Sequence, residues 1–316
     1  MKIYKHIIID VNNLFYRFYS VEKSKNSKLK LFNLKENNIY FKTLISILKH
    51  IERIESQYLT DNGYMYFLFD NPTSRDNIRK EIDENYKKDR VKMENDFYDT
   101  LNLLLYILKN HSDNYYTFQV SFLEADDLVK PLLNNYIKDT LNKILVYSED
   151  MDYSRWITDN VFWYDSKTIY NKENFKAKYL FTPSEGNVTI YKCLTGDKID
   201  KVAKGIKNIS LDVIHRIVEE NYNDIEDLLT NIHFLKYLTK EQIDKFVSNS
   251  NKLRTNYELI RSLDCDWEDI KTYLVNCRIN VPILKKVYEQ LVGNNIKEID
   301  SRDIFEERVE GKNALF

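Results

Sequence analysis

The sequence predicts an α/β fold with a mostly parallel sheet, followed by a helical region. Up to about residue 180, short apolar runs of strand length alternate with longer segments in which apolar residues recur at helical spacing. Beyond that point strand-like runs nearly vanish, and helical stretches follow to about residue 300. Glycine and proline are scarce, six and four in 316 residues, which favours helices over a turn-rich β architecture. We therefore expect a three-layer α/β domain over residues 1–180, a helical region over 181–300 packed against it, and a tail over 301–316.

The expected strands are short runs rich in β-branched and aromatic residues. They are HIII (6–9), YMYFLF (64–69), YYTFQV (115–120) and KILVYS (143–148), followed by a pair of strands at 160–165 and 168–171. The first four are separated by helical segments, as in sheets whose strands run parallel.

The expected helices lie between these strands. Residues 11–20 open a helix behind the first strand, 40–54 and 94–109 carry apolar residues at helical spacing, and 75–90 predict a helix with a basic face. Residues 124–139 predict a helix that begins on acidic residues, which suits its dipole. Residues 21–38 are polar and predict a loop. The second region predicts short helices at 185–195, 211–221, 240–247, 252–263 and 282–292.

Composition excludes several classes of protein. No apolar run reaches the length of a membrane span, and the N-terminus lacks the shape of a signal peptide. The three cysteines, Cys193, Cys265 and Cys277, are too few and too scattered for a disulfide framework or a zinc site, so we expect a reducing cytoplasm. The net charge of −2 argues against nucleic acid at first, yet the bases cluster in 23–35, 75–92 and 198–207.

Acidic residues are placed repeatedly just after the predicted strands. They are Asp10, Asp70, Glu124, Asp126, Asp127, Asp150 and Asp152, with Asp197 and Asp200 further along the chain. Parallel strands bring their carboxyl ends to one edge of a sheet, where so many carboxylates would repel one another unless cations lay between them. Mg²⁺ and Mn²⁺ are hard cations that prefer oxygen ligands. The pattern therefore predicts a metal-dependent enzyme that acts on phosphates.

The order of these motifs from Ile7 to about Ser210 resembles the flap endonuclease and 5′–3′ exonuclease family. It most resembles the phage branch that includes the ribonuclease H of T-even phages. The motifs are IIIDVNNLFYRFY, LFD followed by RKEIDENYKKDR, EADDLV, SEDMDYSRW and LTGDKIDKVAKGIKNIS. The resemblance implies a PIN-like three-layer domain, a helical arch over about 71–96, and a helix-hairpin element that binds DNA. The implied activity is Mg²⁺-dependent hydrolysis of branched or nicked DNA and RNA–DNA, as in the removal of primers during replication.

Two metal ions are implied by this resemblance. Asp10, Asp70, Glu124 and Asp126 would hold one Mg²⁺, with Mn²⁺ as a substitute. The second would be held by Asp150, Asp152 and Asp197, helped by Asp127 or Asp200. Taken singly, each acid could equally be a helix cap or a surface residue.

The basic segment of the arch supplies the implied catalytic cations, Lys87 and Arg90, which would hold the scissile phosphate. Arg79, Asp83 and Lys87 recur at four-residue steps and would share a helix face. We expect Arg79 to contact DNA and Tyr86 to stack on an unpaired base. The alternative is a solvated amphipathic helix.

A row of lysines at every third position, Lys198, Lys201, Lys204 and Lys207, suits contacts to the phosphates of duplex DNA. The alternative is a solvated surface. Two glycine positions of the family are changed here: Glu149 and Met151 flank Asp150, and of the hairpin glycines only Gly205 remains, with Asn208 where a second is common. The loss of hairpin glycines weakens the expectation that a potassium ion assists the binding of duplex DNA.

Further expectations concern partners and competing functions. The lysine-rich segment 23–35 could touch a second duplex arm, and the C-terminal Ala-Leu-Phe resembles tails that bind a sliding clamp, with a single-strand-binding protein as another partner. We expect a monomer. The competing functions are a PIN-type nuclease for single-stranded RNA, a non-catalytic scaffold that binds branched DNA, and a phosphatase.

Overall fold

A six-stranded sheet lies at the centre of the protein, whose structure is a computed structural model that describes residues 2–28, 39–70, 78–88, 93–120, 123–268 and 270. The strands are β1 (Tyr4–Asp10), β2 (Leu59–Phe69), β3 (Tyr115–Gln119), β4 (Lys143–Tyr147), β5 (Val161–Tyr164) and β6 (Ile169–Tyr170). They are ordered β3-β2-β1-β4-β5-β6, and only β6 runs antiparallel to its neighbour. The predicted mostly parallel sheet is confirmed.

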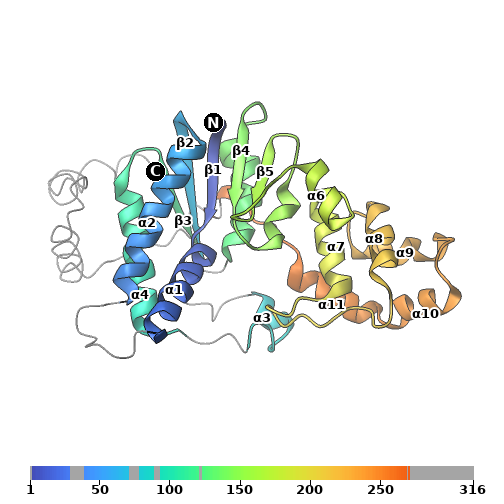
Figure 1. The fold of residues 1–316 in the computed structure, drawn as a ribbon. Coiled ribbons are helices and arrows are strands. Elements are labelled where there is room, and N and C mark those ends of the chain that lie inside the picture. Colours follow the sequence, from blue (N-terminus) through green and yellow to red (C-terminus); the bar gives the residue numbers. More distant parts are fainter. Residues whose placement is uncertain are drawn as a thin grey trace.

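The sheet is buried on both faces, and alternate residues of each strand point to opposite cores. Ile7 and Ile9 of β1 contribute to one core, and Ile8 contributes to the other. Helices α1 (Val11–Lys28), α2 (Ile39–Tyr58) and α4 (Asn95–His111) cover the first face (Figure 1). Three layers result, as the alternation of strands and helices predicts.

The second face carries the rest of the described chain. Short helical turns follow β3 and β4, namely η2 (Ala125–Leu128), α5 (Val129–Pro131), η3 (Leu132–Ile137) and η4 (Met151–Trp156). Helices α6 (Lys172–Tyr179) and α7 (Glu185–Thr195) come next. The helical region adds α8 (Leu211–Glu219), α9 (Ile225–Asn231), η5 (Ile232–Phe234), α10 (Lys240–Ser248) and α11 (Ser250–Ile260). One hydrophobic core runs from Ile8 of the sheet to Phe246 of α10, so the helical region is packed against the sheet domain.

Several expected boundaries differ from the observed ones. α1 continues to Lys28 instead of ending at residue 20, with the hydroxyls of Ser20 and Ser24 bonded back to carbonyls one turn earlier. Polar residues are tolerated there because a helix can extend along a solvated surface. α6 and α9 were not expected, although their N-caps, Asn171 and Asp224, are residues that start helices.

The expected helix over 75–90 is wrong in its extent. Within the described part of this stretch, residues 78–88, only α3 (Ile78–Ile82) is helical, and the chain then turns. The Asp83 carboxylate accepts from the Asn85 backbone N–H at 2.8 Å, a local bond that competes with continuation of the helix. Lys87 has φ of 55° and so leaves the helical region of backbone space. Arg79, Asp83 and Lys87 therefore do not share a helix face.

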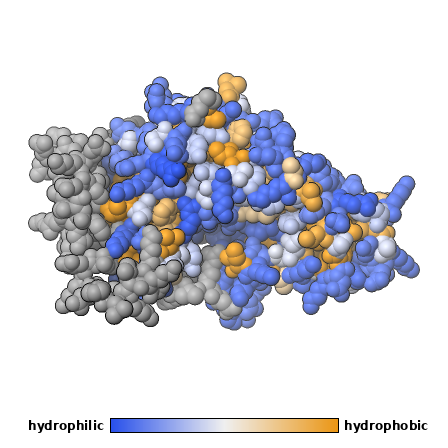
Figure 2. Space-filling model, viewed as in Figure 1, coloured by the Kyte–Doolittle hydropathy of each residue, from blue (hydrophilic) through white to orange (hydrophobic). Residues whose placement is uncertain are grey.

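Hydrophilic residues cover most of the described surface in the view of Figure 2. None of the described helices has both the length and the apolar character needed to cross a bilayer. The expected helix at 282–292, the tail at 301–316, Arg90 and most of the lysine-rich segment 23–35 lie outside the described residues.

Candidate metal-dependent active site

The predicted acids meet at the carboxyl edge of the sheet. Asp10 is the last residue of β1, Asp70 follows the last residue of β2, and Asp150 comes shortly after β4. Because β1 pairs in parallel with both β2 and β4, these three acids emerge on the same side. Glu124 and Asp126 follow β3 at the start of η2. The topology thus assembles them from segments far apart in the chain.

Backbone and hydroxyl donors hold these carboxylates in place. Asp10 accepts from the Asn13 N–H at 3.0 Å and from the Ser148 hydroxyl at 3.1 Å. Asp70 accepts from the Ala125 N–H at 2.8 Å, which links the end of β2 to η2. Asp150 accepts from the Asp152 N–H at 2.9 Å and so caps η4. These acids are therefore oriented by donors from the segments that follow the strands of the sheet, including neighbouring strands.

Burial and mutual repulsion raise the pKa values of three of these acids. The pKa of Asp10 rises to about 7 because the carboxyl is buried and lies near Asp70. The pKa of Asp150 rises to about 6 because its carboxyl is desolvated by the surrounding protein and lies near Asp152, although the residue as a whole is exposed. Asp126 also has its pKa raised well above the usual range, by burial and then by Asp127. A divalent cation is favoured at a site with such raised pKa values, because it would stabilise the ionised forms of the carboxylates.

A second group of acids lies beside the first. Carboxylate oxygens of Asp152, Asp197 and Asp200 all lie within 4.8 Å of one another. Asp197 and Asp200 belong to the turn after α7, where the Asp197 carboxylate accepts from the Asp200 N–H at 3.1 Å. Several oxygen ligands from rigid segments match the preference of Mg²⁺ and Mn²⁺. The residues present therefore fit a divalent metal.

Lys192 of α7 is part of this second group, and the sequence reading missed it. Its ammonium lies 2.7 Å from both the Asp152 and the Asp197 carboxylates, and only 8% of the residue is exposed. Burial would raise the pKa of both acids, but the attraction of Lys192 outweighs it and lowers them. The sequence does carry one sign of a buried lysine at this position, because Lys192 lies within the mostly apolar run VTIYKCL of a predicted helix.

Lys87 lies at the acidic cluster. Its ammonium is 2.6 Å from Glu124 and 3.6 Å from Asp200. The backbone N–H of Lys87 also donates to the Asp200 carbonyl at 3.3 Å. The turn after α3 thus brings a cation to both groups of acids. Arg90 lies outside the described residues.

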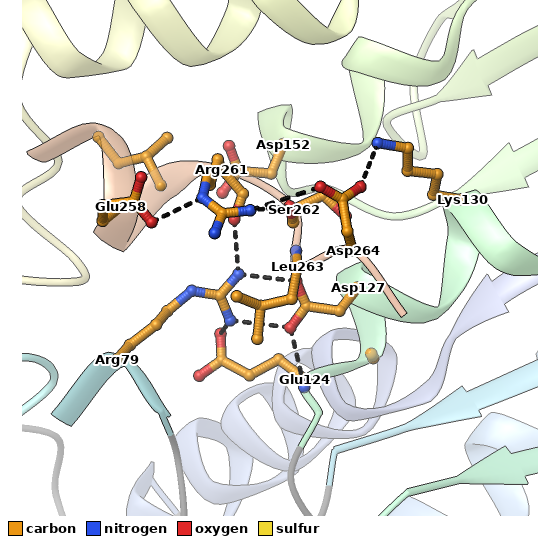
Figure 3. Close-up of polar contacts among 12 residues, drawn as sticks. Arg79, Glu124, Asp127, Lys130, Asp152, Glu258, Arg261, Ser262, Leu263 and Asp264 are labelled. Atoms are coloured by element: carbon orange, nitrogen blue, oxygen red, sulfur yellow. Dashed lines mark hydrogen bonds and ion pairs between the residues drawn. The ribbon is translucent and has the colours of Figure 1, made fainter. Parts of the chain in front are cut away.

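Two residues expected at the DNA surface are buried instead. Tyr86 is 3% exposed, and its hydroxyl donates to Glu124 at 3.2 Å, so its ring does not face a base in this structure. Arg79 is 1% exposed and forms two hydrogen bonds with Asp127, at 2.7 and 2.8 Å (Figure 3). Asp127 is fully buried in this pair. The expected roles of Arg79 in DNA binding and of Asp127 in metal binding are therefore replaced by an internal ion pair.

A family model described as the 5′–3′ exonuclease, N-terminal resolvase-like domain matches residues 5–180, more than half of the chain. The chain belongs to the flap endonuclease and 5′–3′ exonuclease family.

Relatives and solved structures agree with this family. The chain is 26% identical to a 5′–3′ exonuclease of Mycoplasmopsis pulmonis over 90% of its own length and 89% of that protein. It is 26% identical to a 5′–3′ exonuclease of Buchnera aphidicola over 73% of its own length and 75% of that protein. The phage T5 flap endonuclease, solved as a pseudo-enzyme–product complex with DNA and metal ions, matches with a TM-score of 0.56 at 18% identity. The phage T5 5′-exonuclease with zinc matches with a TM-score of 0.56 at 20% identity. These two matches cover 91% of this chain and 98% of each phage chain, and they show that the fold is shared.

The lysine row of this family member lies on an exposed turn beside the acids. Lys198, Lys201, Lys204 and Lys207 are all exposed. The turn is tight: a Cβ on Gly205 would lie 2.3 Å from the Cys193 carbonyl oxygen. Asn208, which stands where the family commonly has glycine, has φ of 58°. Asparagine adopts this left-handed conformation more readily than most residues, so the turn forms without the second glycine.

Replacing Asp10 with Asn is expected to stabilise the metal-free protein, by an amount that grows as the pH rises. The pKa of Asp10 is about 7 in the folded state, against an ordinary value of 3.8. The folded state holds an extra proton between these values, so the contribution of Asp10 to stability is complete below the lower value and is lost as the pH rises through the upper one. In EDTA, the Tm of Asp10→Asn minus that of the wild type should increase between about pH 5 and about pH 8.

The control is Asp61→Asn, since Asp61 is exposed near the amino end of β2, at the opposite edge of the sheet, where it pairs with Lys2. Its Tm difference should stay flat over the same range. A flat difference for Asp10→Asn as well would show that burial and the neighbouring Asp70 do not raise the pKa of Asp10 in the folded state.

Proposed function

We propose that the protein is a structure-specific, divalent-metal-dependent 5′–3′ exonuclease and flap endonuclease. Its substrates are branched or nicked DNA and RNA–DNA, and its role is the removal of primers in replication of the phage type. The observation that carries the proposal is the convergence of the strand-end carboxylates with Lys87 at one edge of the sheet. The similar phage T5 fold with DNA and metal ions supports the same classes of ligand.

Two groups of carboxylates would hold the metal ions in this proposal. Asp10, Asp70, Glu124 and Asp126 form the first group, and Asp150, Asp152, Asp197 and Asp200 form the second. Bound Mg²⁺, or Mn²⁺ in its place, would supply a water nucleophile at neutral pH and stabilise the attacking and leaving oxygens of the phosphodiester. Asp127 is left out of both groups because Arg79 holds its carboxylate.

The chain's own cations act on the substrate. Lys87 would offset negative charge on the phosphoryl oxygens as it develops, from its place beside Glu124. Arg90 would share this role. The exposed row from Lys198 to Lys207 would hold backbone phosphates of the duplex behind the cleavage site, with no preference for sequence.

The substrate must change shape before its phosphate reaches the acids. A base pair at the junction would open, at a cost of a few kcal/mol by analogy with base flipping. Contacts to the duplex through the lysine row would offset this cost. Binding of a potassium ion at this turn is less favoured, because Asn208 occupies one of the glycine positions. Recruitment by a sliding clamp or a single-strand-binding protein would use residues 301–316, which lie outside the described chain.

One cleavage experiment separates this function from the alternatives. An end-labelled 5′-flap duplex, a matched 3′-flap duplex and a single strand are incubated with the full chain in Mg²⁺ and in EDTA. Metal-dependent release near the 5′ junction alone is expected. Equal cutting of the single strand would favour the PIN-type nuclease, and tight binding to the branched duplex without cutting would favour the scaffold.

Asp150→Asn is expected to reduce cleavage by on the order of 10²- to 10³-fold, the scale seen when one directly stabilising group is lost. Binding of the flap duplex, measured by fluorescence anisotropy in Ca²⁺, should remain, because the lysine row is intact. Asp61→Asn is the control and should cleave normally. Unchanged turnover in Asp150→Asn would remove this residue from the metal site.

Lys87→Ala is expected to lower the single-turnover rate by about 10²-fold and to change affinity little, because Lys87 acts where charge develops. The neighbouring Lys88→Ala is the matched control, since the Lys88 ammonium bonds to Asn85 and the residue is exposed. A loss confined to affinity would make Lys87 a residue that only binds substrate.

Lys204→Ala is expected to weaken binding alike for duplexes of different sequence and to reduce the slope of log Kd against log salt by about 1. The control is Lys2→Ala, which removes an exposed lysine at the amino edge of the sheet. An unaltered salt slope in Lys204→Ala would argue against a phosphate contact at this position.

A further inference from the structure

Arg79 lies where three segments of the chain meet. It belongs to α3, the five-residue helix that precedes Lys87. Its guanidinium donates to both carboxylate oxygens of Asp127, and one nitrogen also donates to the Arg261 carbonyl at 2.9 Å (Figure 3). The same group lies 3.3 Å from the Glu124 carboxylate. A single side chain thus bonds to η2 and to the end of α11.

Asp127 completes this junction from the opposite side. Its carboxylate accepts from the Leu263 N–H at 2.9 Å and from the Glu124 N–H at 3.2 Å. The Asp127 carboxylate therefore bonds to the segment after α11 and to the turn that carries Glu124. We call Arg79, Asp127 and the backbone of Arg261 and Leu263 the buried clasp.

The end of α11 is tied to the other half of the acidic cluster as well. Arg155 is buried, donates to the Ile260 carbonyl at 3.0 Å and forms an ion pair with Asp152 at 2.7 Å. Carbonyls at the end of a helix carry partial negative charge, which suits two arginines. The last turn of α11 therefore touches both groups of acids through one arginine each.

α11 also fixes the turn that carries the lysine row. The buried Asn256 amide donates to the Cys193 carbonyl at 3.0 Å and to the Ala203 carbonyl at 2.8 Å. α11 thus contacts α3 through Arg79, the acids through Arg79 and Arg155, and the exposed lysine turn through Asn256. A displacement at the buried clasp would therefore change the position of Lys87 relative to Glu124.

We infer that Arg79 is a positioning residue that sets the place of Lys87 over the acidic cluster through the buried clasp. The inference rests on the proposed function. The path from Arg79 to Lys87 is short: the Asp83 N–H donates to the Arg79 carbonyl, and the Tyr86 N–H donates to the Asp83 carbonyl, immediately before Lys87. Only arginine has a planar fork that reaches two carboxylate oxygens and a carbonyl at once. A lysine at this position would keep the charge and lose the geometry.

Arg79→Lys tests this role. The single-turnover rate on the 5′-flap duplex is expected to fall by on the order of 10- to 100-fold, the scale of a misplacement of about 1 Å at a reacting centre. The Kd for the same duplex in Ca²⁺ should change by less than about threefold, because Arg79 is buried away from the duplex. The matched control is Arg254→Lys, since Arg254 pairs with Glu226 through two nitrogens on the surface of the helical region. This control should cleave normally.

A double-mutant cycle with Lys87→Ala separates positioning from general destabilisation. If Arg79 acts through Lys87, Arg79→Lys should change the rate by less than about threefold when Lys87 is already absent. Equal losses in both backgrounds would overturn the inference, and so would a rise in Kd without a change in rate. If Arg79→Lys does not stay folded at the assay temperature, Asp127→Asn is put through the same cycle, and its result decides.

The wild type distinguishes failure of the inference from failure of the proposed function. A wild type that cleaves the flap, with additive losses in the cycle, overturns the role of Arg79 alone. A wild type that binds the flap and does not cleave it in Mg²⁺ overturns the proposed function and, with it, the inference.

Discussion

Repulsion among carboxylates at one edge of the sheet is the constraint on which the rest of this structure depends. Parallel pairing of β1 with β2 and β4 brings Asp10, Asp70 and Asp150 together whether or not their charges are balanced. The protein handles this charge in two ways. Around Asp10 and Asp150 the charge is left unbalanced, and desolvation together with repulsion raises their pKa values to about 7 and about 6. Glu124, Asp152, Asp197 and Asp200 are paired instead with buried or half-buried bases of the chain itself.

Those bases explain how the helical region is joined to the sheet domain. Lys192 of α7 neutralises Asp152 and Asp197, and two buried arginines, Arg79 and Arg155, bond to acids and to the end of α11. Buried ion pairs add little net stability, but removing one partner costs about 3–5 kcal/mol because it leaves a charge uncompensated. Such pairs therefore specify geometry more than they stabilise the fold. Here they place α3, the acids and the lysine turn around the end of α11.

Much of the fold could be predicted because its signals are local. Strands such as MYFLF and ILVY are continuous apolar runs, and the acids directly after them follow from the direction of a parallel strand. The roles of Arg79 and Asp127 could not be predicted in this way. A basic residue in a polar segment predicts a solvated or DNA-facing side chain, whereas the partners of the buried Arg79, namely Asp127 and the Arg261 carbonyl, lie far away in the chain. Lys192 was missed for the same reason, since its partners come from η4 and the turn after α7.

The turn after α3 shows how an irregular backbone can serve a site. The sequence pattern predicts a continuous helix there, which would have carried the Lys87 side chain along a regular face. The chain instead turns at Asp83, and Lys87 takes a φ of 55°, which costs a residue other than glycine about 1 kcal/mol. The ion pair with Glu124 and the backbone bond to Asp200 hold it in that conformation. An unfavourable backbone conformation that persists only because surrounding contacts enforce it is typical of functional residues. The same contacts place the Lys87 ammonium within 2.6 Å of Glu124 and 3.6 Å of Asp200, one acid from each group.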